Sequence, residues 1–266
     1  MQIDQTHIFK KQFGQNFIRS TTVIKQILDF LEIQPEDNII EIGPGDGRFT
    51  EELIKHDLDK LILVEIDTDL ISFLNSKFEN QISRGKLEIL NQNILDIDLS
   101  TLNPQPKLYG SLPYNISKRI ISKFIECENL PEQMVFIVQK EVAQDYVAKV
   151  PDASYLSNYI KIFADTKLVL KVPKEQFYPM PKVDGGVLLI KPKKIDLKEG
   201  RAIAKFIFNG FRNKRKKLSK VLNSIYRDID WVKKFEALKL NPNARAQELD
   251  YETWLKLFNI QANTNG

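Results

Sequence analysis

The sequence predicts an α/β protein whose doubly wound, mainly parallel sheet is followed by a small all-α domain. Short runs rich in β-branched and aliphatic residues alternate with longer amphipathic stretches through the first part of the chain. This alternation is typical of a parallel sheet with helices on both faces. After residue 198 only helical periodicity remains. We therefore expect one domain over 1–192 and a second, helical domain over 193–266.

Each expected strand is short, and most strands are separated by one amphipathic stretch. The patterns predict strands at 38–42, 60–65, 86–90, 107–110, 133–139, 166–172 and 187–192. They predict helices at 21–32, 48–56, 68–79, 117–128 and 140–149, and then at 200–208, 212–226, 231–238 and 251–258. The additional strand candidate at 166–172, near the end of the series, indicates that the sheet finishes in an antiparallel pair.

The composition excludes several classes of protein. Cys127 is the only cysteine, and His7 and His56 are the only histidines, so neither a disulfide framework nor a metal site is expected. The N-terminus has no apolar core of signal-peptide length, and no apolar run is long enough to span a bilayer. These features predict a cytoplasmic protein with no membrane partner.

Positive charge is concentrated in one segment. Residues 1–190 hold 21 Lys and Arg against 27 Asp and Glu, whereas residues 191–220 hold 12 against 2. Within that segment, residues 211–220 read FRNKRKKLSK, and all four of its polar residue types bind phosphate. The segment predicts a polyanion partner such as a nucleic acid. A solvated basic helix face is the alternative.

A glycine-rich loop follows the first strand of the sheet. In EIGPGDGRFT (41–50), Gly43, Gly45 and Gly47 stand between a strand and a helix, where a ligand can approach the bare backbone near a helix N-terminus. A dinucleotide fingerprint needs its third glycine one place later, where Arg48 stands, so NAD is the weaker interpretation.

Two further strand ends carry polar residues. Glu65 ends the second strand, where a carboxylate accepts hydrogen bonds from both hydroxyls of a ribose; the alternative is that it only caps the following helix. Asn93 follows the third strand and is the expected contact with an adenine ring. With the glycine loop, these residues follow the order that a nucleoside-binding sheet requires.

The fourth strand leads into GSLPYNIS (110–117), whose chemistry fits methyl transfer to an amine. The exocyclic amine of a base is a poor nucleophile because its lone pair is delocalised into the ring. The side chain of Ser111 and a backbone carbonyl held by the proline can accept hydrogen bonds from the amino group and favour a nucleophilic nitrogen. Tyr114 would stack on a base that has left its helix or loop.

GSLPYNIS resembles motif IV of amino-group methyltransferases that use S-adenosyl-L-methionine. Over nearly its full length the chain resembles the KsgA (RsmA) family, the small-subunit rRNA adenine dimethyltransferases. Further similar segments are KKQFGQNFI (10–18), EIGPGDG (41–47), LVEID (63–67), QKEVAQ (139–144), FYPMPKVDGG (177–186) and FRNKRKKLSKVL (211–222). The resemblance implies a Rossmann-like methyltransferase domain with a small helical C-terminal domain.

The resemblance also implies roles for single residues. The positions that would contact S-adenosyl-L-methionine or the pocket beside it are Asn16, Ile18, Gly43, Gly45, Glu65, Asn93 and Ser111. Ser111 and Leu112 would position the target N6, and Tyr114 and Phe177 would hold the adenine between them. The RNA-binding positions, on a basic helix, would be Arg212, Lys214, Arg215, Lys216 and Lys217.

The implied reaction is dimethylation of N6 on two adjacent adenines in the 3′-terminal hairpin loop of 16S rRNA, within the small ribosomal subunit, by a monomeric enzyme. Ser111 stands where most members of the family have Asn, and Asn93 replaces the usual Asp. Two alternatives stay open: a 23S rRNA adenine methyltransferase of the macrolide-resistance type, and a noncatalytic RNA-binding assembly factor. The intact glycine loop and Pro-Tyr pair favour an enzyme.

Overall fold

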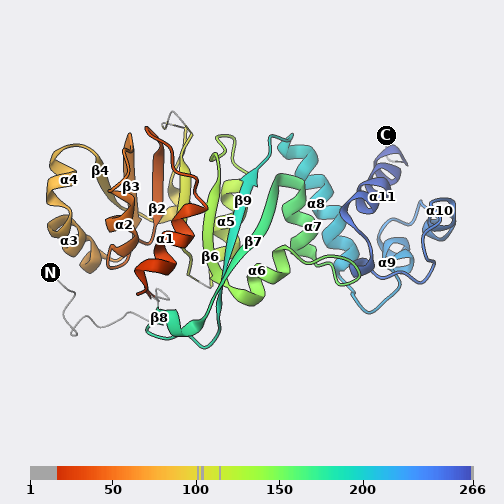
Figure 1. The fold of residues 1–266 in the computed structure, drawn as a ribbon. Coiled ribbons are helices and arrows are strands. Elements are labelled where there is room, and N and C mark those ends of the chain that lie inside the picture. Colours follow the sequence, from red (N-terminus) through yellow and green to blue (C-terminus); the bar gives the residue numbers. More distant parts are fainter. Residues whose placement is uncertain (1–16, 101, 103–104, 114, 265–266) are drawn as a thin grey trace. The chain divides into compact units, whose positions relative to one another are not determined.

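The computed structural model describes residues 17–100, 102, 105–113 and 115–264 (Figure 1). Within these residues the chain forms two compact units. The first contains the residues up to Ala143 together with Lys167–Pro192, and the second contains Gln144–Thr166 and the residues from Lys193 onward. The second unit therefore takes in 144–166, which the sequence-based division places in the first domain, while the later boundary falls at the same position in both divisions.

The first unit is built on a sheet with the strand order β4-β3-β2-β5-β6-β9-β7 in the described part of the chain. Its strands are β2 (Asn38–Ile42), β3 (Lys60–Glu65), β4 (Leu87–Asn91), β5 (Lys107–Ser111), β6 (Met134–Gln139), β7 (Ala164–Val172) and β9 (Gly185–Pro192). The strands from β4 to β6 run parallel, and β9 runs antiparallel to β6. Because β2 lies between β3 and β5, the chain order reverses there, at the switch point where such sheets bind ligands.

The helices of the first unit follow the strands. They are α1 (Thr21–Asp29), α2 (Arg48–Leu53), α3 (Thr68–Lys77), α4 (Glu79–Ser83), α5 (Ser117–Ile125) and α6 (Lys140–Tyr146), the last of which crosses into the second unit. The Ser20 side chain caps α1 by accepting a hydrogen bond from the Val23 N–H, and Asp67 caps α3 in the same way through Asp69. A separate antiparallel pair joins β1 (Phe17–Ile18) to β8 (Phe177–Tyr178).

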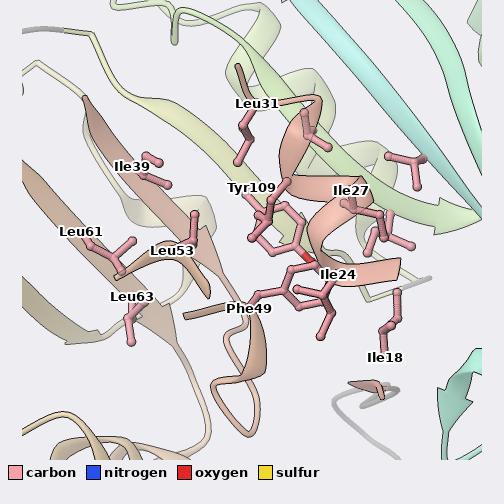
Figure 2. Close-up of a cluster of buried hydrophobic side chains, with 14 of the residues drawn as sticks. Ile18, Ile24, Ile27, Leu31, Ile39, Phe49, Leu53, Leu61, Leu63 and Tyr109 are labelled. Carbon is pink, nitrogen blue, oxygen red and sulfur yellow. The ribbon is translucent and has the colours of Figure 1, made fainter. Parts of the chain in front are cut away.

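One face of the sheet is covered by α1 and α2. Figure 2 shows side chains of α1, among them Ile24 and Ile27, beside Phe49 of α2 and Tyr109 of β5. The rings of Phe49 and Tyr109 lie 4.5 Å apart between centroids. This packing fixes α2, and with it the glycine loop from which α2 begins.

The described part of the second unit is mainly helical. It contains α7 (Tyr155–Phe163), α8 (Leu197–Phe211), α9 (Leu218–Ile225), α10 (Trp231–Ala237) and α11 (Tyr251–Thr264). Phe206 of α8 is the centre of its aromatic core, with ring centroids 5.9 Å from Trp231 and 6.1 Å from Trp254. In neither unit does a described helix combine the length and apolar character needed to cross a membrane.

The prediction of one helix over 212–226 is wrong. Helix α8 ends at Phe211, residues 212–217 form an exposed turn, and α9 begins only at Leu218. Within the turn the Lys216 N–H donates to the Asn213 carbonyl, and the Leu218 N–H then donates to the Ala244 carbonyl at 2.8 Å. Like charges one helical turn apart also disfavour a continuous basic helix. The predicted RNA-binding side chains therefore lie on a turn.

Candidate functional site

A cavity lies at the carboxyl ends of β2, β3 and β5, on both sides of the switch point. Its walls come from β1, from the loops that follow β2, β3 and β4, and from the segment after β5. Of the residues expected to bind cofactor, those that line it are Ile18, Gly43, Gly45, Glu65, Asn93 and Ser111. Asn16 lies outside the described residues. The sequence motifs thus converge on one site, although they are spread over about a hundred residues.

The glycine loop has a backbone conformation that residues other than glycine rarely adopt. Gly43, Gly45 and Gly47 have φ angles of 65°, 59° and 77°, in the left-handed region. A Cβ on Gly45 would overlap the ring of Phe17, which also lines the cavity, whereas a Cβ on Gly43 would meet no protein atom within 4 Å. At Gly43 the backbone therefore presents a bare surface that a ligand can approach closely.

A lysine from α3 holds this loop in place. Lys77 Nζ donates a hydrogen bond to the Asp46 carbonyl oxygen at 2.6 Å and forms an ion pair with Glu51 at 2.8 Å. The Asp46 side chain in turn pairs with Arg48 Nε at 2.6 Å. No sequence pattern indicates this hydrogen bond, because Lys77 and Asp46 lie 31 positions apart and meet only in the folded chain.

Glu41 is a further lining residue that sequence reasoning did not single out. It stands on β2 opposite Leu63 of β3 and Tyr109 of β5, and only 1% of its surface is exposed. Its Oε2 accepts a hydrogen bond from the Thr50 hydroxyl at 2.6 Å. Burial raises the pKa of the Glu41 carboxyl from an ordinary value of 4.5 to about 8. The available signal was a carboxylate inside the apolar strand NIIEI.

The Glu65 carboxylate is held at the cavity wall by backbone groups. Its Oε1 accepts hydrogen bonds from the Ile66 N–H at 2.8 Å and the Asp67 N–H at 2.9 Å. Burial raises the pKa of this carboxyl, although the same backbone hydrogen bonds oppose the rise. Asp67 performs the capping of α3, so the capping alternative does not account for Glu65.

Asn93 lines the cavity after β4 and begins a short 3₁₀ turn, η2 (Ile94–Asp96). Its Oδ1 accepts a hydrogen bond from the Leu95 N–H at 3.0 Å. The side-chain oxygen of Asn93 therefore already has a backbone partner, and what the side chain offers to a ligand is its two amide hydrogens. An aspartate here would offer a second oxygen, which the asparagine does not have.

The last residue of β5 and the segment after it form the opposite wall. Ser111, Pro113 and Asn115 line the cavity, while Leu112 is buried and its N–H donates to the Ile137 carbonyl at 2.9 Å. This bond fixes the backbone beside Ser111 and aligns it with the neighbouring strand. Tyr114, the expected stacking residue, lies outside the described residues.

Phe177 does not line the cavity. Its ring is buried, with 4% of the residue exposed, in the core cluster. A Cβ on Gly185 would lie 2.9 Å from the ring, which gives a physical reason for glycine at that position. The expected sandwich of the target adenine by Phe177 and Tyr114 stays a prediction.

The predicted RNA-binding residues belong to the second unit. Arg212, Lys214, Arg215, Lys216 and Lys217 are all exposed on the turn between α8 and α9. Lys214 Nζ lies 5.9 Å from the centroid of the Phe211 ring at the end of α8. No group of three or more potential metal ligands occurs among the described residues.

The sequence matches the family described as ribosomal RNA adenine dimethylase over residues 6–263. The chain belongs to this family. A ribosomal RNA small subunit methyltransferase A from Mycoplasma capricolum is 32% identical over 94% of this chain and 97% of its own length. The protein of the same name from Aliarcobacter butzleri is 35% identical over 94% of each chain.

Solved structures share the fold of this dimethylase family member. The 23S rRNA methyltransferase ErmE superposes with a TM-score of 0.73 at 22% identity, over 92% of this chain and 99% of its own. A dimethyladenosine transferase from Plasmodium falciparum gives the same TM-score at 24% identity, over 92% and 98%. The Rossmann-like methyltransferase fold and the family resemblance are confirmed.

Proposed function

We propose that this chain is a methyltransferase that uses S-adenosyl-L-methionine to dimethylate N6 of two adjacent adenines in the 3′-terminal hairpin loop of 16S rRNA. The observation that carries the proposal is the single cavity where the glycine loop, the Glu65 carboxylate and Ser111 meet. Membership of the rRNA adenine dimethylase family and the names of the relatives support an rRNA substrate. We further propose that it acts on the small ribosomal subunit, in the cytoplasm, as a monomer.

The groups that line the cavity are suited to the parts of the cofactor. Glu65 would present a carboxylate to the two ribose hydroxyls, and the bare backbone at Gly43 leaves room for close approach. Asn93 and the neighbouring Ile94 line the part that would hold the adenine ring. When bound, S-adenosyl-L-methionine supplies a methyl group already activated by its sulfonium.

The last residue of β5 and the residue after it would place the target amine. The Ser111 hydroxyl, which lines the cavity, and the Leu112 carbonyl would accept hydrogen bonds from its two hydrogens, and the Leu112 N–H is bonded to the Ile137 carbonyl. Fixing the amine in line with the methyl group would provide much of the acceleration, because it removes the entropy cost of bringing the reactants together. The methylated nitrogen is strongly acidic until it loses its proton, so the proton can pass to water.

The decisive experiment is transfer of radiolabelled methyl groups to unmethylated small subunits and, in parallel, to naked large-subunit rRNA, with mapping of the labelled adenines. Dimethyladenine in the small-subunit 3′ hairpin is the expected result. Label only in large-subunit rRNA would assign the chain to the macrolide-resistance type. Cofactor binding without label on either RNA would indicate a noncatalytic assembly factor.

A matched pair of variants ties the activity to this site. Glu65→Gln can keep one oxygen on the backbone N–H groups of Ile66 and Asp67, but it then turns an amide donor, in place of the second carboxylate oxygen, toward the ribose hydroxyls, so we expect cofactor affinity to fall at least tenfold. Glu88→Gln changes a half-buried carboxylate on β4, which pairs with Lys60 and does not line the cavity, and should leave affinity unchanged. Equal affinity in all three proteins would contradict the assignment of the cavity.

A further inference from the structure

The β1–β8 pair lies beside the cavity, which is lined in part by β1. Phe17 and Ile18 of β1 line the cavity, and they pair with Tyr178 and Phe177 of β8. The pairing extends by one bond, because the Arg19 N–H donates to the Gln176 carbonyl at 3.1 Å. Successive side chains on each strand point to opposite faces, so Phe17 and Tyr178 share one face of the pair while Ile18 and Phe177 share the other.

Outward side chains on and beside this pair form an exposed surface with a cationic, an aromatic and an aliphatic member. Tyr178 is 42% exposed, although its neighbour Phe177 is buried. The Arg19 guanidinium carbon lies 3.5 Å from the centroid of the Tyr178 ring, and Arg19 is itself exposed. Met180, two positions further along, is 61% exposed. We call these three side chains, Arg19, Tyr178 and Met180, the rim cluster.

A rim cluster of this composition matches unpaired nucleotides. Bases of single-stranded RNA stack on aromatic side chains and on the plane of an arginine guanidinium, and arginine also attracts the phosphates on either side. The cluster is continuous with the wall of the cavity through Phe17, whose partner in the register is Tyr178.

The reaction supplies an occupant for this surface. Two adjacent adenines in a hairpin loop are the substrate, so while one adenine enters the cavity its neighbour is unpaired and only one nucleotide away. Resting on the proposed function, we infer that Arg19 and Tyr178 form a subsite that stacks the base next to the adenine being methylated. The alternative is that the contact between Arg19 and Tyr178 only stabilises the pairing of β1 with β8.

The subsite is tested by changing the protein and the RNA together. Small subunits are prepared in which one of the two adenines is replaced by uridine, which stacks less well, and kcat/KM is measured for transfer to the remaining adenine. We expect a loss of about tenfold from Tyr178→Ala with the natural sequence, and a similar loss from uridine with the wild-type enzyme. With both changes together, the loss should hardly exceed either alone.

A purely structural role predicts a different pattern. If Tyr178 only fastens the strands, the losses from Tyr178→Ala and from uridine will multiply, to about a hundredfold, and the inference is overturned. Arg19→Lys keeps the charge but removes the planar surface, so it should also cause a loss that disappears with the uridine substrate. Phe208→Ala, at an exposed aromatic residue of the second unit, is the control and should respond to uridine as the wild type does.

Measurements of cofactor affinity and of methyl transfer distinguish a failure of this inference from a failure of the proposed function. Tyr178 does not line the cavity, so Tyr178→Ala should bind S-adenosyl-L-methionine as tightly as the wild type. If the wild-type chain transfers no methyl group to small subunits, the proposed function fails and the subsite fails with it. If it does transfer methyl groups but the losses multiply, only the subsite is wrong.

Discussion

The Thr50 hydroxyl donates a hydrogen bond to Glu41 Oε2 across 2.6 Å, joining the helix and the strand that flank the glycine loop. Both side chains are buried, and desolvation raises the pKa of the Glu41 carboxyl to about 8. The Thr50 bond and the charge of Lys77 act against that rise, while Asp46 and Glu65 add to it. The folded protein therefore keeps Glu41 protonated at neutral pH.

The first prediction concerns stability against pH. In the unfolded chain Glu41 loses its proton near pH 4.5, but in the folded chain it keeps the proton to about pH 8. Between these values the folded state binds one more proton, so this carboxyl makes stability fall by about 1.4 kcal/mol per pH unit as pH rises. Glu41→Gln should remove that fall while preserving an acceptor for Thr50.

Denaturant unfolding of wild type and Glu41→Gln at pH 5, 6, 7 and 8 measures the effect. The stability of the variant relative to wild type should increase steadily across the series. A difference that stays constant with pH would show that Glu41 titrates normally. Glu88→Gln, on the edge strand β4, serves as the control.

The second prediction concerns Lys77. Lys77→Met removes the hydrogen bond to the Asp46 carbonyl and the ion pair with Glu51, but keeps an unbranched apolar stem. We expect the dissociation constant for S-adenosyl-L-methionine to rise between roughly threefold and tenfold, because the glycine loop is then less well ordered. Isothermal titration calorimetry measures it.

Lys55→Met is the matched control for that substitution. Lys55 forms an exposed ion pair with Glu52 and does not touch the glycine loop. Such pairs contribute little to stability or binding. If both variants bind the cofactor equally well, Lys77 does not position the loop.

The third prediction concerns Asn93. Because its Oδ1 already accepts from Leu95, the side chain offers amide hydrogens to a ring whose exocyclic amine is also a donor. Asn93→Asp keeps the Leu95 bond and adds an acceptor, so affinity for S-adenosyl-L-methionine should rise several-fold. An analogue with hypoxanthine in place of adenine should show no gain. Weaker binding of the natural cofactor by the variant would contradict the placement of the adenine ring.

The central part of the fold was predictable because its signals are local. The runs NIIEI and KLILVE form β2 and β3 at the predicted residues, since strands buried on both faces are nearly continuous apolar runs. Helix α7 was missed because its inward side includes the polar residues Ser157 and Asn158. The capping box between Ser154 and Ser157 was the signal that could have indicated it.

The cofactor side of the site was predictable for a related reason. In a parallel sheet the carboxyl ends of the strands meet at one edge, so motifs that follow successive strands must converge. The burial of Phe177, the neutral carboxyl of Glu41 and the bond from Lys77 to Asp46 were not predictable, because each depends on interactions between segments far apart in the chain. The basic turn was wrongly predicted as a helix, since charge alone does not reveal whether a backbone is helical.

The last prediction tests that basic turn as a phosphate-binding surface. We consider a variant with Ser in place of Arg212, Lys214, Arg215, Lys216 and Lys217. It should bind 16S rRNA and RNA of unrelated sequence more weakly to a similar extent, because these exposed side chains would bind phosphates and not bases. The slope of log affinity against log salt concentration should become shallower by about 0.7–0.9 for each phosphate that the variant no longer neutralises. Cofactor affinity should not change, since the cavity is lined only by residues of the first unit.

The control variant changes Lys233 and Lys234 of α10 to Ser. It removes exposed charge elsewhere in the second unit and should leave the slope nearly unaltered. Slope changes in proportion to the charges removed, about five to two, would mean that total charge, and not the turn, governs RNA binding.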